Sequence, residues 1–307
     1  MAASTSFTGV FPILITPFDD DENLDLASFE KVVRFMVEIG VDGITILGVL
    51  GEANRLIDAE REQLILTAIQ AADGAIPVVV GTSHTGTRAA LQLSQMAESL
   101  GASGIMLTPG HEPVPNEERI FEYFQQVAAG ISIPIVAQDH PASTQVHMSP
   151  SLLLRLVREI PQVACIKEEA TPTPPKIRAL RAGMQDRKVS ILTGLGALYG
   201  QFDLESGADG FMTGFALPEV LKALVEGENK NREEEMRALY TRFLPLIVFE
   251  QQPGLAVRKE IYRRRGLIVS NRVRHPGASI LPEAATQLQS IVDQVLPNID
   301  ITRPLVP

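Results

Sequence analysis

The sequence contains very little cysteine and no tryptophan, with Cys165 as the one cysteine among 307 residues. A single cysteine excludes an internal disulfide and fits a reducing compartment. No apolar run reaches the roughly 18 residues that a membrane-spanning helix needs. The opening residues MAASTSFTGV also lack the charged start and the long apolar core of a signal peptide. These absences predict a soluble cytoplasmic protein that has no membrane partner.

Basic residues are scarce as well. The chain has 27 lysine and arginine residues against 37 aspartate and glutamate residues, a net charge of −10. No basic run lies beside aromatic residues, so a nucleic-acid partner is not expected. The basic cluster Arg263-Arg264-Arg265 is more typical of the solvated end of a helix.

Apolar residues, by contrast, are plentiful. They make up 45% of the chain against 21% charged residues, which is ample for a core and gives no sign of disorder. A length of 307 residues exceeds the usual single domain, but α/β barrels of this size commonly form one domain.

A strand followed by a helix recurs along the chain. Gly9–Pro17 is predicted to be a buried strand, and Asp25–Ile39 has the apolar spacing of a helix that ends at Gly40. The further strands predicted are Gly43–Gly48, Pro77–Gly81, Gly104–Thr108, Pro134–Gln138, Val163–Lys167, Val189–Thr193 and Gly210–Thr213. Short, wholly apolar strands of this kind indicate a parallel sheet covered on both faces. Eight such units predict a closed (β/α)₈ TIM barrel.

An open, doubly wound sheet is the alternative fold. No predicted strand is followed directly by G-x-G-x-x-G or by a Walker glycine loop. The segment Thr193–Gly200 comes nearest and lacks a ribose-binding acid on a following strand. We therefore expect no dinucleotide site.

Three further amphipathic helices follow the eighth unit, over Asn231–Ile247, Gly254–Arg265 and Pro282–Leu296. The sequence thus predicts a barrel over residues 1–230 and a C-terminal three-helix extension over residues 231–307 that packs on the barrel.

Lys167 is the most informative residue of the predicted barrel. Of seven lysines it alone ends an uninterrupted apolar run of strand length, a position from which lysine is depleted. Burial favours the neutral amine, the form that attacks a carbonyl to give a Schiff base. The alternative is a structural lysine that reaches solvent or pairs with Glu168 or Glu169.

Three of the five histidines follow predicted strands, at the barrel face where chemistry occurs. His84 follows the third strand, His111 the fourth, and Asp139-His140 the fifth. These residues also suggest a metal site as an alternative, but no HxH or HExxH pair is present at ligand spacing. No metal is predicted.

Taken together, these motifs resemble the dihydrodipicolinate synthase / N-acetylneuraminate lyase family of class I, Schiff-base-forming enzymes. The similarity covers nearly the whole chain. The matching segments are GVFPILITPF, the G-x-x-G-E loop Gly48–Glu52, PVVVGTS at 77–83, LTP at 107–109, Ile166-Lys167-Glu168, Gly210–Thr213 and Arg274-His275-Pro276.

The resemblance implies a homotetramer or homodimer that binds pyruvate or another 2-oxo acid as an imine on Lys167, without a cofactor. It also implies that the backbone of Gly48, Val49, Leu50 and Gly51 holds the substrate carboxylate, as preorganised donors do for an anion. Further substrate-binding residues are expected at Gln138, Thr193, Gly194 and Met212.

The chain departs from the family pattern in the residues for proton transfer. Val49 and Leu50 stand where the family has two hydroxyl residues, Gln138 and His111 stand where it has tyrosines, and Ser143 replaces an arginine of the synthases. An amide does not exchange protons near pH 7. We therefore expect Gln138 to position the substrate, and His111 and His140 to act as acid and base.

The predicted function is a lyase of the aldolase or dehydratase type that acts on a small 2-oxo acid, such as pyruvate or a 2-keto-3-deoxy sugar acid. Two alternatives stay open at this point. One is a catalytically silent barrel that binds 2-oxo acids, and the other is a metal-dependent barrel enzyme that does not use the lysine.

Overall fold

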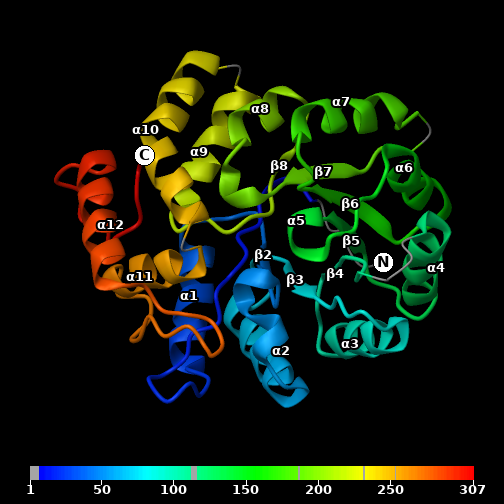
Figure 1. The fold of residues 1–307 in the computed structure, drawn as a ribbon, viewed down its shortest axis with the longest axis horizontal. Coiled ribbons are helices and arrows are strands. Elements are labelled where there is room, and N and C mark those ends of the chain that lie inside the picture. The colour runs from blue at the N-terminus through cyan, green and yellow to red at the C-terminus, as the bar shows by residue number, and fades with distance from the viewer. Residues whose placement is uncertain (1–6, 112–115, 186, 231, 253) are drawn as a thin grey trace.

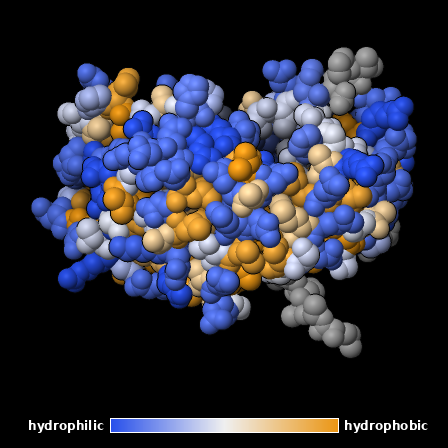
Figure 2. Space-filling model, turned by 90° about the horizontal axis from the view of Figure 1, so that it is seen from below, coloured by the Kyte–Doolittle hydropathy of each residue, from blue (hydrophilic) through white to orange (hydrophobic). Residues whose placement is uncertain are grey.

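The computed structural model describes residues 7–111, 116–185, 187–230, 232–252 and 254–307. No helix within these ranges is both long and apolar enough to cross a bilayer. Figure 2 shows one face of the molecule, on which hydrophilic residues predominate and hydrophobic residues lie among them.

Eight parallel strands form the sheet at the centre of the molecule (Figure 1). They are β1 (Gly9–Val10), β2 (Ile44–Ile46), β3 (Val78–Gly81), β4 (Gly104–Leu107), β5 (Ile135–Asp139), β6 (Val163–Glu168), β7 (Ser190–Thr193) and β8 (Gly210–Phe211). The strand order is β1-β8-β7-β6-β5-β4-β3-β2. A parallel bridge between Ile13 and Thr45 joins the two ends of this order. The predicted (β/α)₈ barrel is therefore confirmed.

Helices cover the outside of the sheet (Figure 1). They are α1 (Leu26–Glu38), α2 (Asp58–Ala72), α3 (Thr87–Ser99), α4 (Glu117–Ala128), α5 (Pro141–Thr144), α6 (Pro150–Glu159), α7 (Thr173–Gly183), α8 (Gly200–Glu205) and α9 (Pro218–Asn229). The helix predicted over Asp25–Ile39 starts one residue later, because Asp25 is its N-cap and accepts a hydrogen bond from the Ser28 amide.

The first strand is shorter than predicted. Regular pairing covers only Gly9–Val10 of the predicted Gly9–Pro17. The chain beyond it still bonds to both neighbours, since the Ile13 amide donates to Thr213 and the Leu14 amide to Thr45. Pro12 and Pro17 have no amide hydrogen, which interrupts a continuous ladder.

The apolar residues form two layers. A small cluster fills the inside of the barrel and includes Phe11, Val136, Cys165 and Met212. A much larger cluster lies between the sheet and the surrounding helices. The buried cysteine is thus a barrel-filling residue.

Three helices follow the barrel: α10 (Glu233–Gln251), α11 (Leu255–Arg264) and α12 (Pro282–Val295). They match the predicted extension closely, although the expected start at Asn231 lies outside the described residues. Helix α10 packs against α9 and α12 (Figure 1). The large apolar cluster also includes residues of this extension, such as Phe243 and Ile261. The division into units at residues 230 and 231 stays a prediction.

Candidate active site

Lys167 lies near the carboxyl end of β6, beside Gln138 of β5, with which it is in register. Successive residues of a strand face opposite sides of the sheet. Lys167 and Gln138 line a cavity. The next residues of the two strands, Glu168 and Asp139, are also in register with each other and lie on the other side of the barrel wall. Only 3% of the surface of Lys167 is exposed.

The carboxylate of Glu169 is the centre of the hydrogen-bond network around Lys167. Its Oε2 atom lies 2.9 Å from Lys167 Nζ and accepts a hydrogen bond from Gln138 Nε2 at 2.7 Å. Its Oε1 atom accepts from the Leu195 amide at 3.1 Å. Both oxygens are therefore held in place, and the lysine is paired within the cavity.

The electrostatics of this network favour an ionised Glu169 and a neutral His140. Burial opposes ionisation of Glu169, but the charge of Lys167 and the hydrogen bonds from Gln138 and Lys167 outweigh it and hold its pKa below the ordinary value; His140 adds to this effect when it is protonated. Burial lowers the pKa of His140, against the opposing charge of Glu169. His140 Nδ1 lies 4.0 Å from Glu169 Oε2 and 2.7 Å from the Ser143 hydroxyl.

Gly194 makes room for Glu169. A Cβ atom at this position would lie 1.9 Å from Glu169 Oε1, closer than any non-bonded contact. Gly194 thus contributes by allowing the carboxylate to reach Lys167.

The cavity above Lys167 has a volume of about 150 Å³. Pockets for drug-sized ligands measure about 300–1,000 Å³, so this one suits a small molecule. Its lining consists of Ile13, Val49, Leu50, Gln138, His140, Lys167, Glu169, Leu195, Gly196, Thr213, Gly214, Gln251 and Arg258.

The predicted glycine loop forms one wall of this cavity. Val49–Gly51 is a short 3₁₀ turn, and the first amides of such a turn have no partner within it. Glu52 anchors the loop, because its carboxylate accepts from Lys259 Nζ at 2.5 Å and from the Arg274 amide at 3.0 Å. Lys259 is fully buried by this pairing and does not line the cavity.

The C-terminal extension supplies two side chains to the cavity, Gln251 of α10 and Arg258 of α11. Arg258 is 6% exposed, and its Nε donates to Glu250 Oε2 at 2.9 Å. The extension thus places a buried cation beside the barrel's candidate active site.

Some predicted site residues lie elsewhere. The Thr193 hydroxyl is hydrogen-bonded to Asp203, and Met212 belongs to the cluster that fills the barrel. His111 is exposed and is not among the described residues that line the cavity. Neither Gly48 nor Gly51 lines it, so within the glycine loop only Val49 and Leu50 do.

The histidines do not gather into a ligand set. His84 Nδ1 accepts a hydrogen bond from the Gly86 amide in its own loop. Within the described ranges, no group of three His, Cys, Asp or Glu side chains is arranged to hold a metal ion.

A second lysine-carboxylate cluster lies behind the same strands. Lys176 of α7 contacts Asp139, and its Nζ lies 3.6 Å from Glu168 Oε2. Burial and the nearby charge of Asp139 raise the pKa of Glu168 to about 8. This cluster does not line the cavity.

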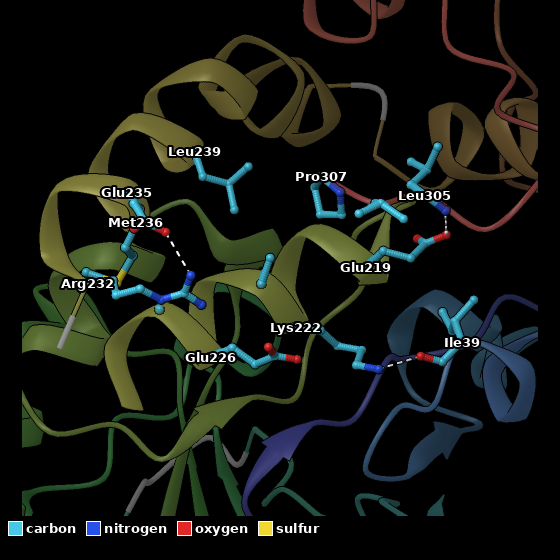
Figure 3. A pocket seen from close by; sticks show the side chains of 13 residues that line it. Ile39, Glu219, Lys222, Glu226, Arg232, Glu235, Met236, Leu239, Leu305 and Pro307 are labelled. Atoms are coloured by element: carbon cyan, nitrogen blue, oxygen red, sulfur yellow. Dashed lines mark hydrogen bonds and ion pairs between the residues drawn. The ribbon is translucent and has the colours of Figure 1, made fainter. Parts of the chain in front are cut away.

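A larger hollow of about 390 Å³ lies between α9, α10 and the C-terminal residues (Figure 3). Lys222 donates to the Ile39 carbonyl there, and Arg232 pairs with Glu235 at 2.9 Å. Its charged groups are already paired, and it shares no lining residue with the cavity at Lys167.

Glu169, Gln251 and Arg258 are among the cavity residues that the sequence did not single out as site residues. Glu169 was considered only as a pairing partner for Lys167. Its position two residues after Lys167 could have indicated that both side chains lie on the same face of the strand. Gln251 and Arg258 are more than 80 residues from Lys167 in the sequence and lie in helices with no local motif. Only the packing of the extension brings them to the cavity.

A (β/α)₈ barrel with a buried lysine near the carboxyl end of its sixth strand has the architecture of the Schiff-base-forming lyases. Residues 6–295 match the model of the dihydrodipicolinate synthetase family. The chain belongs to this family, which confirms the resemblance seen in the sequence.

Individual relatives support two related activities. The chain is 36% identical over 95% of its length to an L-2-keto-3-deoxyarabonate dehydratase of Azospirillum brasilense, 95% of which is covered. It is 32% identical over 93% of its length to a 4-hydroxy-tetrahydrodipicolinate synthase of Persephonella marina, 97% of which is covered.

Solved structures agree with this assignment. The crystal structure of dihydrodipicolinate synthase from Rhodopseudomonas palustris has a TM-score of 0.90 and 35% identity, and the match covers 94% of this chain and 97% of that one. The protein is therefore a class I lyase of the aldolase/dehydratase type that acts on a small 2-oxo acid.

Proposed function

We propose that this lyase dehydrates a 2-keto-3-deoxy sugar acid such as L-2-keto-3-deoxyarabonate, through an imine on Lys167. The observation that carries the proposal is the Glu169 carboxylate, 2.9 Å from Lys167 Nζ, in a site where Gln138 replaces the tyrosine of the usual family relay. The similarity to the Azospirillum brasilense dehydratase supports the same choice.

The first step forms the imine. Lys167 transfers a proton to Glu169, and its neutral amine attacks C2 of the substrate. The C2 oxygen then leaves as water, taking one proton from the amine and one back from Glu169. This gives a protonated C2=N bond and leaves Glu169 ionised. The substrate carboxylate lies against the Val49 and Leu50 amides in this arrangement, as preorganised donors bind an anion.

The second step eliminates water from the substrate. The protonated imine draws electrons away from the C3–H bond, so that a base can remove a C3 proton and leave an enamine. Glu169 is the group we assign to this transfer. It then gives the proton to the C4 hydroxyl, which departs as water while C3 and C4 become doubly bonded. One carboxylate serves as base and then as acid, a role typically worth about 10²- to 10⁴-fold in rate.

The remaining cavity residues position these groups. Gln138 donates to Glu169 Oε2 and so fixes the carboxylate toward Lys167. Neutral His140, close to Glu169, is a second route for the proton. His111 stays a prediction as an acid or base: its exposed position does not support the role, and an unchanged rate in His111→Asn would remove it from the site.

Two broader properties also belong to the proposal. We expect a homotetramer or homodimer, because of the family resemblance, and a cytoplasmic location, because the single cysteine fits a reducing compartment. Measurement of the mass in solution by light scattering tests the first of these.

The test of the reaction is to incubate the protein with L-2-keto-3-deoxyarabonate and to identify the products by mass spectrometry. Dehydration gives one organic product that has lost one water. Release of pyruvate instead would show aldol cleavage and overturn the proposed reaction. Synthase activity at the level of a 4-hydroxy-tetrahydrodipicolinate synthase, without dehydration, would overturn it as well.

A further inference from the structure

Arg258 is a buried cation that the reaction described above does not use. It belongs to α11 of the C-terminal extension, more than nine-tenths of its surface is buried, and it lines the same cavity as Lys167 and Glu169. A charge is costly to bury unless it is paired or has a ligand. The groups around the Arg258 guanidinium therefore indicate whether it binds a ligand.

One edge of the guanidinium is fixed by Glu250. The Nε atom donates to Glu250 Oε2 at 2.9 Å, and Glu250 Oε1 accepts from the Ala216 amide at 3.2 Å. Within the described residues, no hydrogen bond occupies the two terminal Nη groups. Arginine carries five N–H donors, so those groups are open to an oxygen of a ligand.

Two glycines let the guanidinium approach the cavity. A Cβ atom at Gly196 would lie 3.2 Å from Arg258 Nη2, and one at Gly214 would lie 3.4 Å from Arg258 Nε. Gly196 also has a positive φ of 63°, a conformation that favours glycine. These glycines follow β7 and β8, so Arg258 reaches the cavity from the β7–β8 side.

The substrate carboxylate is assigned to the backbone amides of the β2 loop. Val49 and Leu50 follow β2, and Lys167 lies on β6, which is on the opposite side of an eight-stranded order. A substrate held by its carboxylate at β2 and by C2 on Lys167 directs its remaining carbons away from the β2 loop. The Nη2 atom of Arg258 lies beside Gly196, which follows β7, the strand next to β6, whereas its Nε atom lies toward Gly214 and the Leu50 side chain.

We propose that Arg258 is a specificity-determining residue that binds an oxygen on the substrate carbons beyond C3. The ligand group is a hydroxyl or a second carboxylate, both of which accept hydrogen bonds from a guanidinium. This inference rests on the proposed function, because it requires the imine on Lys167. It adds the residue that would select a 2-oxo acid with an oxygen beyond C3 over pyruvate.

Burial of Glu250 supports this role. Burial raises the pKa of Glu250 to about 7, even though Arg258 lies beside it. The carboxylate therefore compensates the guanidinium only in part near neutral pH. The remaining positive charge is available to the ligand.

The test measures how much 2-oxo acid is needed for half-maximal imine trapping with borohydride, read as adduct mass. Two probes are compared: pyruvate, which ends at C3, and a five-carbon 2-keto-3-deoxy sugar acid. The variant is Arg258→Gln combined with Glu250→Gln, so that no buried charge is left unpaired. Arg263→Gln on the same helix is the control, because Arg263 is exposed and pairs with Glu260 outside the cavity.

In the double variant, the concentration of sugar acid needed for half-maximal trapping should rise by roughly 10- to 100-fold, the effect of losing a hydrogen bond to a charged group. The concentration of pyruvate needed for half-maximal trapping should stay at the parent value. In Arg263→Gln, the values for both probes should stay at the parent level. If the double variant does not fold, Arg258→Lys tests the same point. It keeps the charge beside Glu250 but loses the fork of donors, and it should raise the sugar-acid value alone.

An equal rise for both probes would overturn the inference, because Arg258 would then act on the part of the ligand that pyruvate shares. No change for either probe would overturn it too. Absence of any adduct in the parent protein would instead refute the imine on Lys167, and with it the proposed function.

Discussion

A lysine paired with carboxylates lies on each side of the barrel wall at strands β5 and β6. On the inner side, Lys167 pairs with Glu169 beside Gln138. On the outer side, Lys176 pairs with Asp139 and Glu168. Both groups include neighbouring residues of β5 and β6, whereas Lys176 comes from α7, and the two groups differ in what surrounds them.

The inner group is both satisfied and accessible. Each oxygen of Glu169 has a hydrogen-bond donor, and the group lines a cavity. In the outer group, Asp139 Oδ1 and Glu168 Oε2 have no hydrogen-bond partner among the residues that the structure describes, and none of the group's members lines that cavity. A lysine paired with a carboxylate is thus not enough for chemistry, because the reaction also needs space for a substrate.

Replacing each lysine by methionine should give the largest difference between the inner and outer groups. Lys167→Met is expected to reduce turnover by on the order of 10⁶-fold, as removal of a covalent nucleophile does in other enzymes. Lys176→Met should retain imine formation but lose about 3–5 kcal/mol of stability, because it leaves buried carboxylates unpaired. Steady-state kinetics and urea unfolding measure the two effects. Loss of stability without loss of turnover in Lys167→Met would reverse the assignment.

The second largest difference is expected between the effects on turnover of replacing Glu169 and Glu168. Glu169→Gln is expected to lower turnover by about 10²- to 10⁴-fold, because an amide cannot carry the proton between C3 and the C4 hydroxyl. Glu168→Gln, one residue away and outside the cavity, should retain turnover near the parent value. Turnover of the 2-keto-3-deoxy sugar acid measures both. Equal losses in the two variants would show that Glu169 acts only through the structure.

The smallest expected difference concerns stability as a function of pH. The pKa of Glu168 is raised from 4.5 to about 8 in the folded protein. The folded state therefore binds more protons than the unfolded state between these values, and its stability falls as the pH rises through them. Glu168→Gln should remove part of that fall.

Glu169→Gln is the matched control for this pH effect. The pKa of Glu169 is lowered, so its contribution is present above the ordinary pKa of 4.5 and is lost at lower pH. Its removal should leave the decline between pH 4.5 and about 8 unchanged. Urea midpoints at a series of pH values test this, and an identical decline in Glu168→Gln and the parent would contradict the account.

The sequence predicts the barrel well because its short apolar strands recur with little ambiguity. Six predicted strands contain the observed ones, and β5 and β6 run one residue past the predicted ends. Lys167 could be found because a lysine at the end of an apolar strand is unusual. The histidine assignment was weaker, because a strand end fixes where a loop starts but not where its side chain points. His140 reaches the cavity and His111 does not.

Contacts between distant segments could not be read from local patterns. Arg258 and Lys259 are adjacent in α11, but one lines the cavity and the other is fully buried against Glu52. Helical periodicity gives the face of a helix and not the element that packs on it. The role of the extension therefore became visible only in the folded chain.

The imine itself is the most direct test of the account. The protein is incubated with pyruvate and borohydride, digested, and the modified lysine is located by mass spectrometry, with Lys167→Met as the comparison. We predict one adduct, on Lys167, and none in the variant. Modification of Lys176 or Lys259, or an undiminished adduct in Lys167→Met, would contradict the central claim.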